Sequence, residues 1–358
     1  MAEHDKRRGS RSPKTMIPSG EPRRITMKDV AKRAGVSQPT VSFVLNDRRD
    51  VSVAEETRAR VLQAAKELNF QPNRAARALR SNKSYTVGVI ANGIVSQPYA
   101  GQIALGVQQA VQPAGYVCFV VEPSESSDAV DVAVQNLVAQ GVDGLIYAAP
   151  APAPIHAAAI ESDVRTIFVN CWAENAQGAP QILADEYQGG RDAAAATFAA
   201  GHRNVVYLGG PMDDYACNER ERGLVDAARD AGIDPAGIRR KYGDYNIHSG
   251  YELALDVLSR ENPTALICGN DRMAVGALMA AHASRLDCPD DVSIVGFDDQ
   301  PDIAEQLQPP LTTVALPHLQ MGLTAGAAML AEEEPSRRQL IPCRYIPRGS
   351  LAAPRPPR

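Results

Sequence analysis

Cysteine is scarce in this sequence and follows no pattern. The 358 residues include six cysteines, and no two of them form a Cys-x-x-Cys pair. This spacing argues against a zinc site, and it favours reduced thiols in the cytoplasm over a disulfide framework. No cysteine lies in a recognisable nucleophile motif, so we do not expect a catalytic one. The six positions are Cys118, Cys171, Cys217, Cys268, Cys288 and Cys343.

Long apolar runs are also missing. Residues 1–24 are rich in Lys, Arg, Ser and Pro and have almost no large apolar side chains. They therefore lack the apolar segment of a signal peptide and should form a disordered basic tail. No run elsewhere is long enough to span a bilayer. We expect the protein to be soluble and cytoplasmic, with no membrane partner.

Catalytic motifs are a third absence. The chain has neither a G-x-x-x-x-G-K-[ST] phosphate loop nor a G-x-S-x-G elbow, and its six histidines show no metal-ligand spacing. Asp298 and Asp299 do not form a glycosidase pair, because adjacent residues on a strand point to opposite faces. We therefore predict a protein that is not an enzyme and needs neither a cofactor nor a metal.

Net positive charge is lacking overall, since the chain carries -5. The charges are divided unevenly, however. Residues 1–83 hold 19 Lys or Arg and 9 Asp or Glu, a net +10, and the remainder holds 18 and 33, a net -15. A cationic N-terminal part on an acidic body is typical of a nucleic-acid reader with a separate regulatory body.

Two short helices and a sharp turn are predicted near the N-terminus. Thr26 with Asp29 is a capping-box start, and Val30, Ala31 and Ala34 form one apolar face before Gly35 supplies the turn. Ser37 is a good N-cap for a second helix, in which Pro39 is tolerated in the first turn and Val41, Val44 and Leu45 recur at helical spacing. This is a helix-turn-helix pattern, and its second helix can lie in a DNA major groove.

A third helix and a short cationic segment follow. Ser52 with Glu55 is expected to open the helix, and an apolar stripe along it should close a three-helix core. Asn73 is a possible N-cap for the segment at 71–83. The stripe consists of Val61, Leu62, Ala65 and Leu68.

Beyond residue 84 the pattern changes to α/β alternation. Short apolar runs at 86–91, 116–121, 144–148 and 166–169 read as buried strands, with helices at 103–112 and 130–140 between them. A second set of strands is expected at 204–208, 265–268 and 292–296. This alternation predicts parallel sheets covered by helices, in two successive units with a cleft between them.

These runs together resemble the lactose/galactose repressor family of bacterial transcription regulators. The matching stretches are "TMKDVAKRAGVSQPTVSFVLN", "TRARVLQAAKELNFQPNRAARALR" and "VGVI". The resemblance covers nearly the whole chain after the tail. It implies an α/β protein with a three-helix headpiece, a hinge helix, and a two-lobed body like a periplasmic binding protein.

The resemblance also implies domain boundaries. The headpiece would span 25–70, the hinge 71–83 and the effector-binding and dimerisation body 84–350, followed by a tail at 351–358. Lobe 1 would comprise about 84–184 plus 314–337, and lobe 2 about 187–312 plus 340–350. The chain would cross between the lobes near 184–189, 311–316 and 337–341.

For DNA, the resemblance implies that Gln38, Pro39 and Phe43 reach base edges. Gln38 can read adenine through its amide. Phe43 departs from the family, where Arg is frequent at this place, so it either meets a thymine methyl or packs inward. In the hinge, Ala76 and Leu79 match a minor-groove pair. Positions expected at phosphates or in packing nearby are Thr26, Ser37, Thr40, Ser42, Asn46, Asn73, Arg77 and Arg80.

For the effector, the resemblance points to a cleft between the lobes. Arg220, three residues before Gly223, matches a residue that grips the ligand, and a guanidinium, an amide and a carboxylate can satisfy adjacent hydroxyls of a sugar. The second lobe would contribute Arg220, Tyr245, Asn270, Asp271 and Asp298. The first lobe would contribute Asn92, Tyr99 and Asn170.

The sequence therefore predicts a homodimeric, ligand-responsive transcription regulator, most readily a repressor. Its partners would be a pseudo-palindromic DNA operator and a sugar or similar polar effector. The alternative is a cytoplasmic small-molecule binding protein whose headpiece no longer reads DNA specifically.

Overall fold

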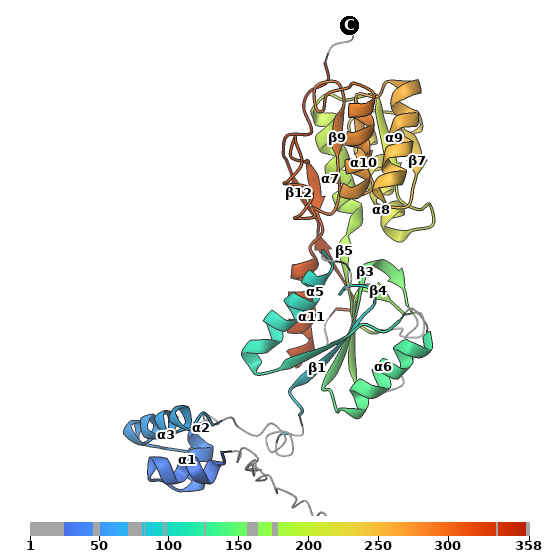
Figure 1. Cartoon of the computed structure of the whole chain (residues 1–358). Helices are drawn as coiled ribbons and strands as arrows, with labels where there is room; N and C mark the ends of the chain where they lie inside the picture. The colour runs from blue at the N-terminus through green and yellow to red at the C-terminus, as the bar shows by residue number, and fades with distance from the viewer. Residues whose placement is uncertain are drawn as a thin grey trace, which may run out of the picture. The chain divides into compact units, whose positions relative to one another are not determined.

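The structure is a computed structural model of the whole chain. It describes residues 25–45, 51–70, 81, 83–95, 97, 99–124, 127–155, 164–173, 178–333 and 336–355. The chain divides into two compact units, with the boundary between Asn82 and Lys83 (Figure 1). We call the described part of the first unit the headpiece and that of the second unit the body.

The headpiece consists of three helices whose first turn is set by local chemistry. The Asp29 carboxylate accepts hydrogen bonds from the backbone N–H of Thr26, at 2.8 Å, and from its hydroxyl, at 2.7 Å. Gly35 then adopts the left-handed conformation, with φ of 67°, which favours glycine because it has no Cβ. The predicted start and turn are confirmed. The helices are α1 (Met27–Ala34), α2 (Gln38–Leu45) and α3 (Glu55–Glu67).

A small apolar core joins these helices. Two details of the predicted third helix are wrong. α3 begins at Glu55 after Ala54, so Ser52 does not cap it, because Val53 packs on the core in the extended segment before the helix. Leu62 is 49% exposed, and Ala64 replaces it in the core. The buried stripe therefore follows the spacing i, i+3, i+4 from Val61. The core residues are Val30, Ala31, Ala34, Val41, Val44, Val61, Ala64 and Ala65.

The first lobe of the body is a six-stranded parallel sheet in the order β11-β5-β4-β3-β1-β2. Helices α5 and α11 cover one face and α6 covers the other (Figure 1). The strands are β1 (Thr86–Ala91), β2 (Val117–Val121), β3 (Gly144–Pro154), β4 (Arg165–Trp172), β5 (Gln181–Asp185) and β11 (Arg338–Pro342). The helices are α5 (Gly101–Val111), η1 (Gln112–Ala114), α6 (Ser127–Ala139) and α11 (His318–Leu330).

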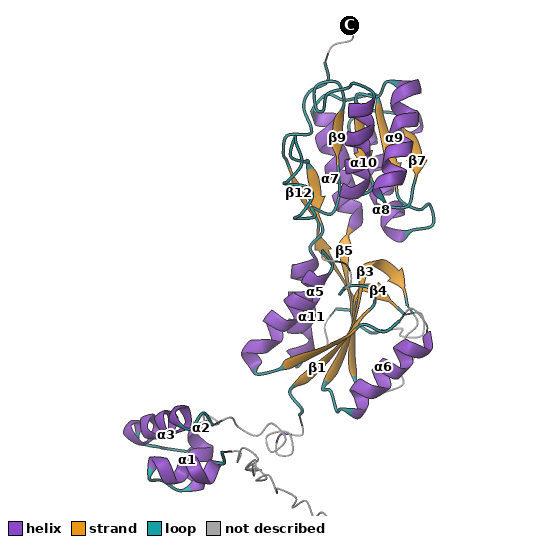
Figure 2. Cartoon of the chain, in the orientation of Figure 1, coloured by secondary structure: helices purple, strands orange, loops and turns teal. Residues whose placement is uncertain are grey.

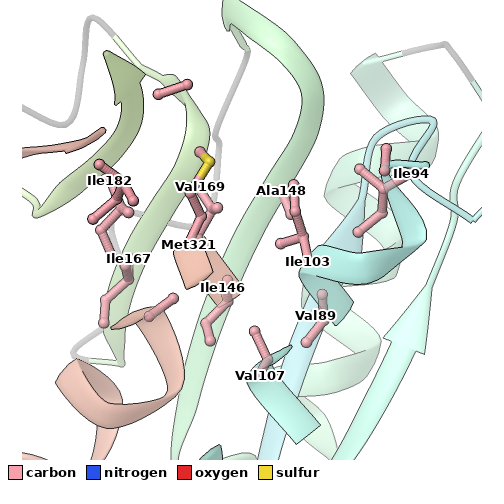
Figure 3. Close-up of a cluster of buried hydrophobic side chains, with 14 of the residues drawn as sticks. Val89, Ile94, Ile103, Val107, Ile146, Ala148, Ile167, Val169, Ile182 and Met321 are labelled. Carbon is pink, nitrogen blue, oxygen red and sulfur yellow. The ribbon is translucent and has the colours of Figure 1, made fainter. Parts of the chain in front are cut away.

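Side chains alternate between the two faces of this sheet. Val89 and Ile146 face α5 and α11 (Figure 3). The next residues in each strand, Ile90 and Tyr147, face α6. The prediction of a buried strand at 116–121 is wrong in one respect. β2 is an edge strand, and its Phe119 is 46% exposed.

The second lobe has the same layered plan with fewer strands. A four-stranded parallel sheet, β7-β6-β8-β9, lies between the pair α9 and α10 and the pair α7 and α8 (Figure 2). The strands are β6 (Val205–Gly209), β7 (Arg239–Tyr242), β8 (Ala265–Cys268) and β9 (Ser293–Val295). The helices are α7 (Glu186–Ala199), α8 (Tyr215–Asp230), η3 (Pro235–Gly237), α9 (Ile247–Glu261) and α10 (Asp271–Ala283).

The chain passes between the two lobes three times. β5 belongs to the first sheet and α7, which follows it directly, packs on α8 of the second lobe. The second passage runs from β10 (Thr313–Ala315) into α11, and the third from β11 into β12 (Arg344–Ile346). β10 and β12 pair antiparallel beside each other. Among the described residues, no helix is long and apolar enough to cross a bilayer.

Candidate functional site

The second helix of the headpiece is positioned by its own cap. The Ser37 hydroxyl accepts the backbone N–H of Thr40 at 3.3 Å and shares a second hydrogen bond with the Thr40 hydroxyl. Val41 and Val44 anchor α2 in the core, so its other side faces outward. Gln38 and Pro39 are exposed there. This leaves an amide and an apolar ring available to a DNA groove.

The remaining DNA-contact predictions fall into three groups. Thr26 and Ser37 are exposed at the starts of α1 and α2, where helix N-termini favour phosphate. Ser42 and Phe43 are half-buried, and Phe43 is not among the core residues of the headpiece. The other predicted positions, Asn46, Asn73, Ala76, Arg77, Leu79 and Arg80, lie outside the described residues.

The body contains a cavity of about 230 Å³ between its lobes. Side chains from the first lobe and from the second lobe line it, as expected for a ligand site at the carboxyl ends of parallel strands. The residues lining it are Gln97, Tyr99, Pro150, Ala151, Pro152, Glu186, Ala216, Arg220, Asp244, Tyr245, Asn246, Asn270, Arg272, Asp298 and Leu316.

Two glycines bring Arg220 to this cavity. A Cβ on Gly190 would come within 2.3 Å of the Arg220 carbonyl oxygen, and one on Gly223 within 2.2 Å of the Tyr187 carbonyl oxygen. Only glycine at both places lets α7 and α8 pack this closely. The close packing sets Arg220 of α8 beside Glu186, the first residue of α7. The spacing Arg-x-x-Gly therefore has a packing reason in this chain.

The Arg220 guanidinium is held on several sides. Its Nε donates to Glu186 Oε2 at 2.7 Å, and its Nη1 donates to the Gly269 carbonyl oxygen. The guanidinium carbon lies 3.7 Å from the centroid of the Phe297 ring, and Nη2 lies 3.9 Å from Asp298 Oδ1. Arg220 is 5% exposed. Its orientation is thus fixed before any ligand arrives.

The charges in this cluster shift one another's protonation. Burial by itself would lower the pKa of Arg220. The combined interactions with Glu186, Tyr245 and Asp298 outweigh burial, so the pKa is raised well above its usual value. Burial raises the pKa of Asp298, and the Arg220 charge opposes that rise. Asp298 also accepts a hydrogen bond from the Gln300 side-chain amide at 2.9 Å. The cluster holds a permanent cation next to a carboxyl group that is easier to protonate than usual.

Asn270 and Tyr245 form a second wall of the cavity. Asn270 caps α10, with its Oδ1 accepting the backbone N–H of Met273 at 2.8 Å, and its Nδ2 donates to the Tyr245 carbonyl oxygen at 3.0 Å. The Tyr245 hydroxyl donates to Asp214 at 2.7 Å. Gly210 makes room for the aromatic ring, since a Cβ there would overlap it. Tyr245 therefore presents a fixed ring to the cavity.

Tyr99 and Arg272 face each other from the two lobes. The Arg272 guanidinium carbon is 5.8 Å from the centroid of the Tyr99 ring, a cation–π distance. The Tyr99 hydroxyl donates to Gln97, and the centroid of its ring lies 5.7 Å from that of the buried His318. Burial lowers the pKa of His318 to about 4. This first-lobe wall is therefore neutral and aromatic near pH 7.

Sequence comparison identifies the family. A model described as bacterial regulatory proteins of the lacI family matches residues 26–73, and a model described as a periplasmic binding protein-like domain matches residues 194–351. The HTH-type transcriptional repressor PurR of Proteus mirabilis is 34% identical over 310 residues, which cover 85% of this chain and 89% of that protein. The chain belongs to the lacI family of bacterial regulatory proteins.

Two further relatives extend the likeness along the chain. The sucrose operon repressor of Escherichia coli is 32% identical over 336 residues, covering 91% of this chain and 99% of that protein. The crystal structure of the lac repressor dimer bound to operator and the anti-inducer ONPF matches with a TM-score of 0.69 at 29% identity. That match covers 92% of this chain and 100% of the lac repressor chain. The predicted family and fold class are confirmed.

Three of the effector residues predicted for this lacI-family protein do not line the cavity. Asn92 follows β1 and is exposed elsewhere. Asn170 is fully buried, and Pro150, Ala151 and Pro152 of β3 line the cavity instead. Asp271 points inward, where its carboxylate accepts the Thr313 hydroxyl at 2.6 Å and the Gln300 N–H at 2.8 Å. Burial raises its pKa.

The structure also adds residues that sequence reasoning missed. Glu186 lines the cavity and pairs with Arg220, while Arg272 and Asp244 supply further charge. One signal for Glu186 was present, because it opens a helix immediately after a crossing strand, where a carboxylate is favoured by the helix dipole. Within the described part of the chain, no cluster of three His, Cys, Asp or Glu side chains could hold a metal ion.

Proposed function

We propose that this lacI-family protein is a ligand-responsive, sequence-specific DNA-binding regulator, and that it acts as a repressor. The observation that carries the proposal is the combination of a helix-turn-helix with a cavity lined by fixed polar side chains from both lobes. The curated relatives are named as repressors, and the lac repressor was solved as a dimer on operator. A regulator of this kind couples occupancy of the cavity to binding of the operator.

The DNA side of the proposal rests on α2 and on the charge of the N-terminal part. Gln38, Pro39 and Phe43 would face bases, and Thr26, Ser37, Thr40, Ser42 and Asn46 would face phosphates or pack. The hinge residues Ala76 and Leu79 would enter the minor groove, where an apolar wedge kinks the duplex, with Asn73, Arg77 and Arg80 beside them. Two chains related by a twofold axis would read a pseudo-palindrome.

The effector side rests on Tyr99, Arg220, Tyr245, Asn270 and Asp298, which the cavity brings together. Three carboxylates and two guanidiniums line the space, and the most buried guanidinium already has a carboxylate partner. An anionic ligand would meet excess negative charge there. We therefore propose a neutral polar effector rich in hydroxyl groups, such as a sugar, whose ring stacks on the aromatic walls.

The arrangement of the chain follows the same proposal. The headpiece would extend over 25–70, the hinge over 71–83 and the effector-binding and dimerisation body over 84–350. A basic tail at 1–24 would precede them. We place the protein in the cytoplasm, where the DNA and the metabolite are both present.

The proposal is tested with full-length protein and two measurements. A thermal-shift screen with neutral sugars, polyols, nucleosides and sugar phosphates identifies the effector class, because a ligand that binds only the folded state raises the melting temperature. Fluorescence anisotropy with the promoter duplex next to the protein's own gene then measures operator affinity with and without that compound. Stabilisation by a sugar with no specific DNA binding would support the alternative, a small-molecule binding protein.

A further inference from the structure

The helix that faces DNA bears no charge. The sequence of α2 is QPTVSFVL, and neither a basic nor an acidic residue occurs between Gln38 and Leu45. Guanine in the major groove is read mainly by Arg or Lys, which bond O6 and N7 together. Within α2, base reading therefore depends on one amide, on hydroxyl groups and on apolar surface.

Two apolar residues of this helix, Pro39 and Phe43, lie on the side opposite the buried Val41. Val41 is fully buried in the headpiece core, and Phe43, two positions later, is rotated by about 200° around the helix axis. Pro39 is four residues before Phe43 and thus adjacent to it on the same face. Phe43 is half-buried and does not belong to the core cluster. Helix geometry thus puts Pro39 and Phe43 side by side on the face of α2 turned away from the core.

We propose that Phe43 is a specificity-determining residue that reads the C5-methyl group of a thymine in the major groove, so that the operator half-site is recognised through A·T pairs. This rests on the proposed function. The methyl group is the one apolar feature that a base pair presents in that groove. Pro39 would hold the phenyl ring in place, and Gln38 would bond an adjacent adenine through N6 and N7.

The experiment removes single methyl groups from the DNA. Full-length protein first selects its preferred duplexes from a random library, and the enriched sequence serves as the operator. Each thymine of that duplex is then replaced in turn by uracil, which differs only in lacking the methyl group. Dissociation constants are measured by anisotropy at one fixed salt concentration for the wild type, Phe43→Ala, Phe43→Leu and Gln38→Ala.

We expect one thymine per half-site at which uracil weakens wild-type binding by about fourfold, the value for losing one buried methyl group. Replacing both symmetric thymines should cost about 15-fold. Phe43→Ala should bind the thymine and uracil duplexes equally. Gln38→Ala is the matched control on the same helix, and it should keep the uracil effect while losing its preference for adenine at a neighbouring position.

Other outcomes overturn the inference. If the selected operator tolerates uracil at every thymine, or if Phe43→Ala keeps the full difference, Phe43 does not read a methyl group. Should Phe43→Ala fail to fold, Phe43→Leu and the wild-type uracil scan decide the question. A selection that enriches no sequence would mean that the protein does not recognise a specific operator, and the proposed function would fail. Specific binding that is insensitive to thymine methyl groups would overturn only the role of Phe43.

Discussion

The pair of Glu186 and Arg220 gives the most quantitative test of how the effector cavity is built. Both side chains are buried and their atoms are 2.7 Å apart, with side-chain exposures of 1% and 6%. Arg220→Met removes the cation and leaves Glu186 and Asp298 buried near each other without the guanidinium between them. Breaking a buried pair from one side costs about 3–5 kcal/mol.

The reverse change is milder. Glu186→Gln keeps an acceptor for the Arg220 Nε–H, and Asp298 remains as a second anion 3.9 Å from the guanidinium. We expect it to lower the free energy of unfolding by roughly 1–3 kcal/mol. The double variant removes both charges together. Its free energy of unfolding should therefore fall by less than the sum of the two single-variant losses, and this difference, the coupling energy, should be at least about 2 kcal/mol.

The body offers a matched control pair. Arg240 Nε and Glu221 Oε1 are also 2.7 Å apart, but both side chains are 22% exposed and lie outside the effector cavity. Glu221→Gln and Arg240→Met repeat the same substitutions at the same distance with more solvent. The coupling energy between Glu221 and Arg240 should stay below about 1 kcal/mol.

Urea denaturation followed by tryptophan fluorescence measures these energies. Trp172 is the chain's one tryptophan and lies in the body, 5.4 Å from the ring of Tyr215, so its emission reports unfolding of the body. Equal coupling in the two pairs, or additive losses at Glu186 and Arg220, would refute the view that Arg220 is fixed by a buried ion pair. Arg220 would then be free to bind a ligand without a structural role.

Three further predictions concern ligand binding, pH and salt. Asp298→Asn should weaken effector binding by about 10- to 100-fold in calorimetry, because a charged acceptor is lost, with operator affinity in the absence of effector unchanged. Burial lowers the pKa of His318 to about 4, so the folded state disfavours protonation of this side chain. The free energy of unfolding should therefore fall as pH drops from 6.5 toward 4, where the unfolded chain binds the proton first. His318→Gln should reduce that loss, measured by urea titration, by up to about 3 kcal/mol. Operator affinity should fall steeply as salt rises, since the first 83 residues carry a net +10, and a flat dependence measured by anisotropy would contradict charge-driven binding.

The sequence predicted the parts of the fold that local chemistry decides. The Thr26 and Asp29 capping box and the turn at Gly35 depend on neighbours within a few residues, and both are present. The predicted start of α3 at Ser52 is wrong. Ser52 is a suitable residue type for a cap, but the packing of Val53 on the core decides where the helix begins. Packing between distant residues is not visible in a local pattern.

The candidate site shows the same division. Arg220, Tyr245, Asn270 and Asp298 could be placed by family motifs, and all four line one cavity. Asp271 is adjacent to Asn270, yet the first turn of α10 directs its carboxylate into the protein, toward Thr313.

The remaining differences depend on contacts between separate segments. Asn170 comes directly after the predicted strand at 166–169, and no local pattern in the sequence indicates that it is fully buried. Glu186 and Arg272 line the cavity because helices from different segments of the chain meet there, and a local sequence pattern does not show such a meeting.

The most direct test of the central claim is the affinity of full-length protein for its operator in the presence and absence of the compound that the thermal-shift screen selects. We expect saturating effector to change this affinity by about 5- to 150-fold, the usual range of coupling between two sites. We also expect Asp298→Asn to shift the response to higher effector concentrations. An effector that occupies the cavity and leaves operator affinity unaltered would contradict the account.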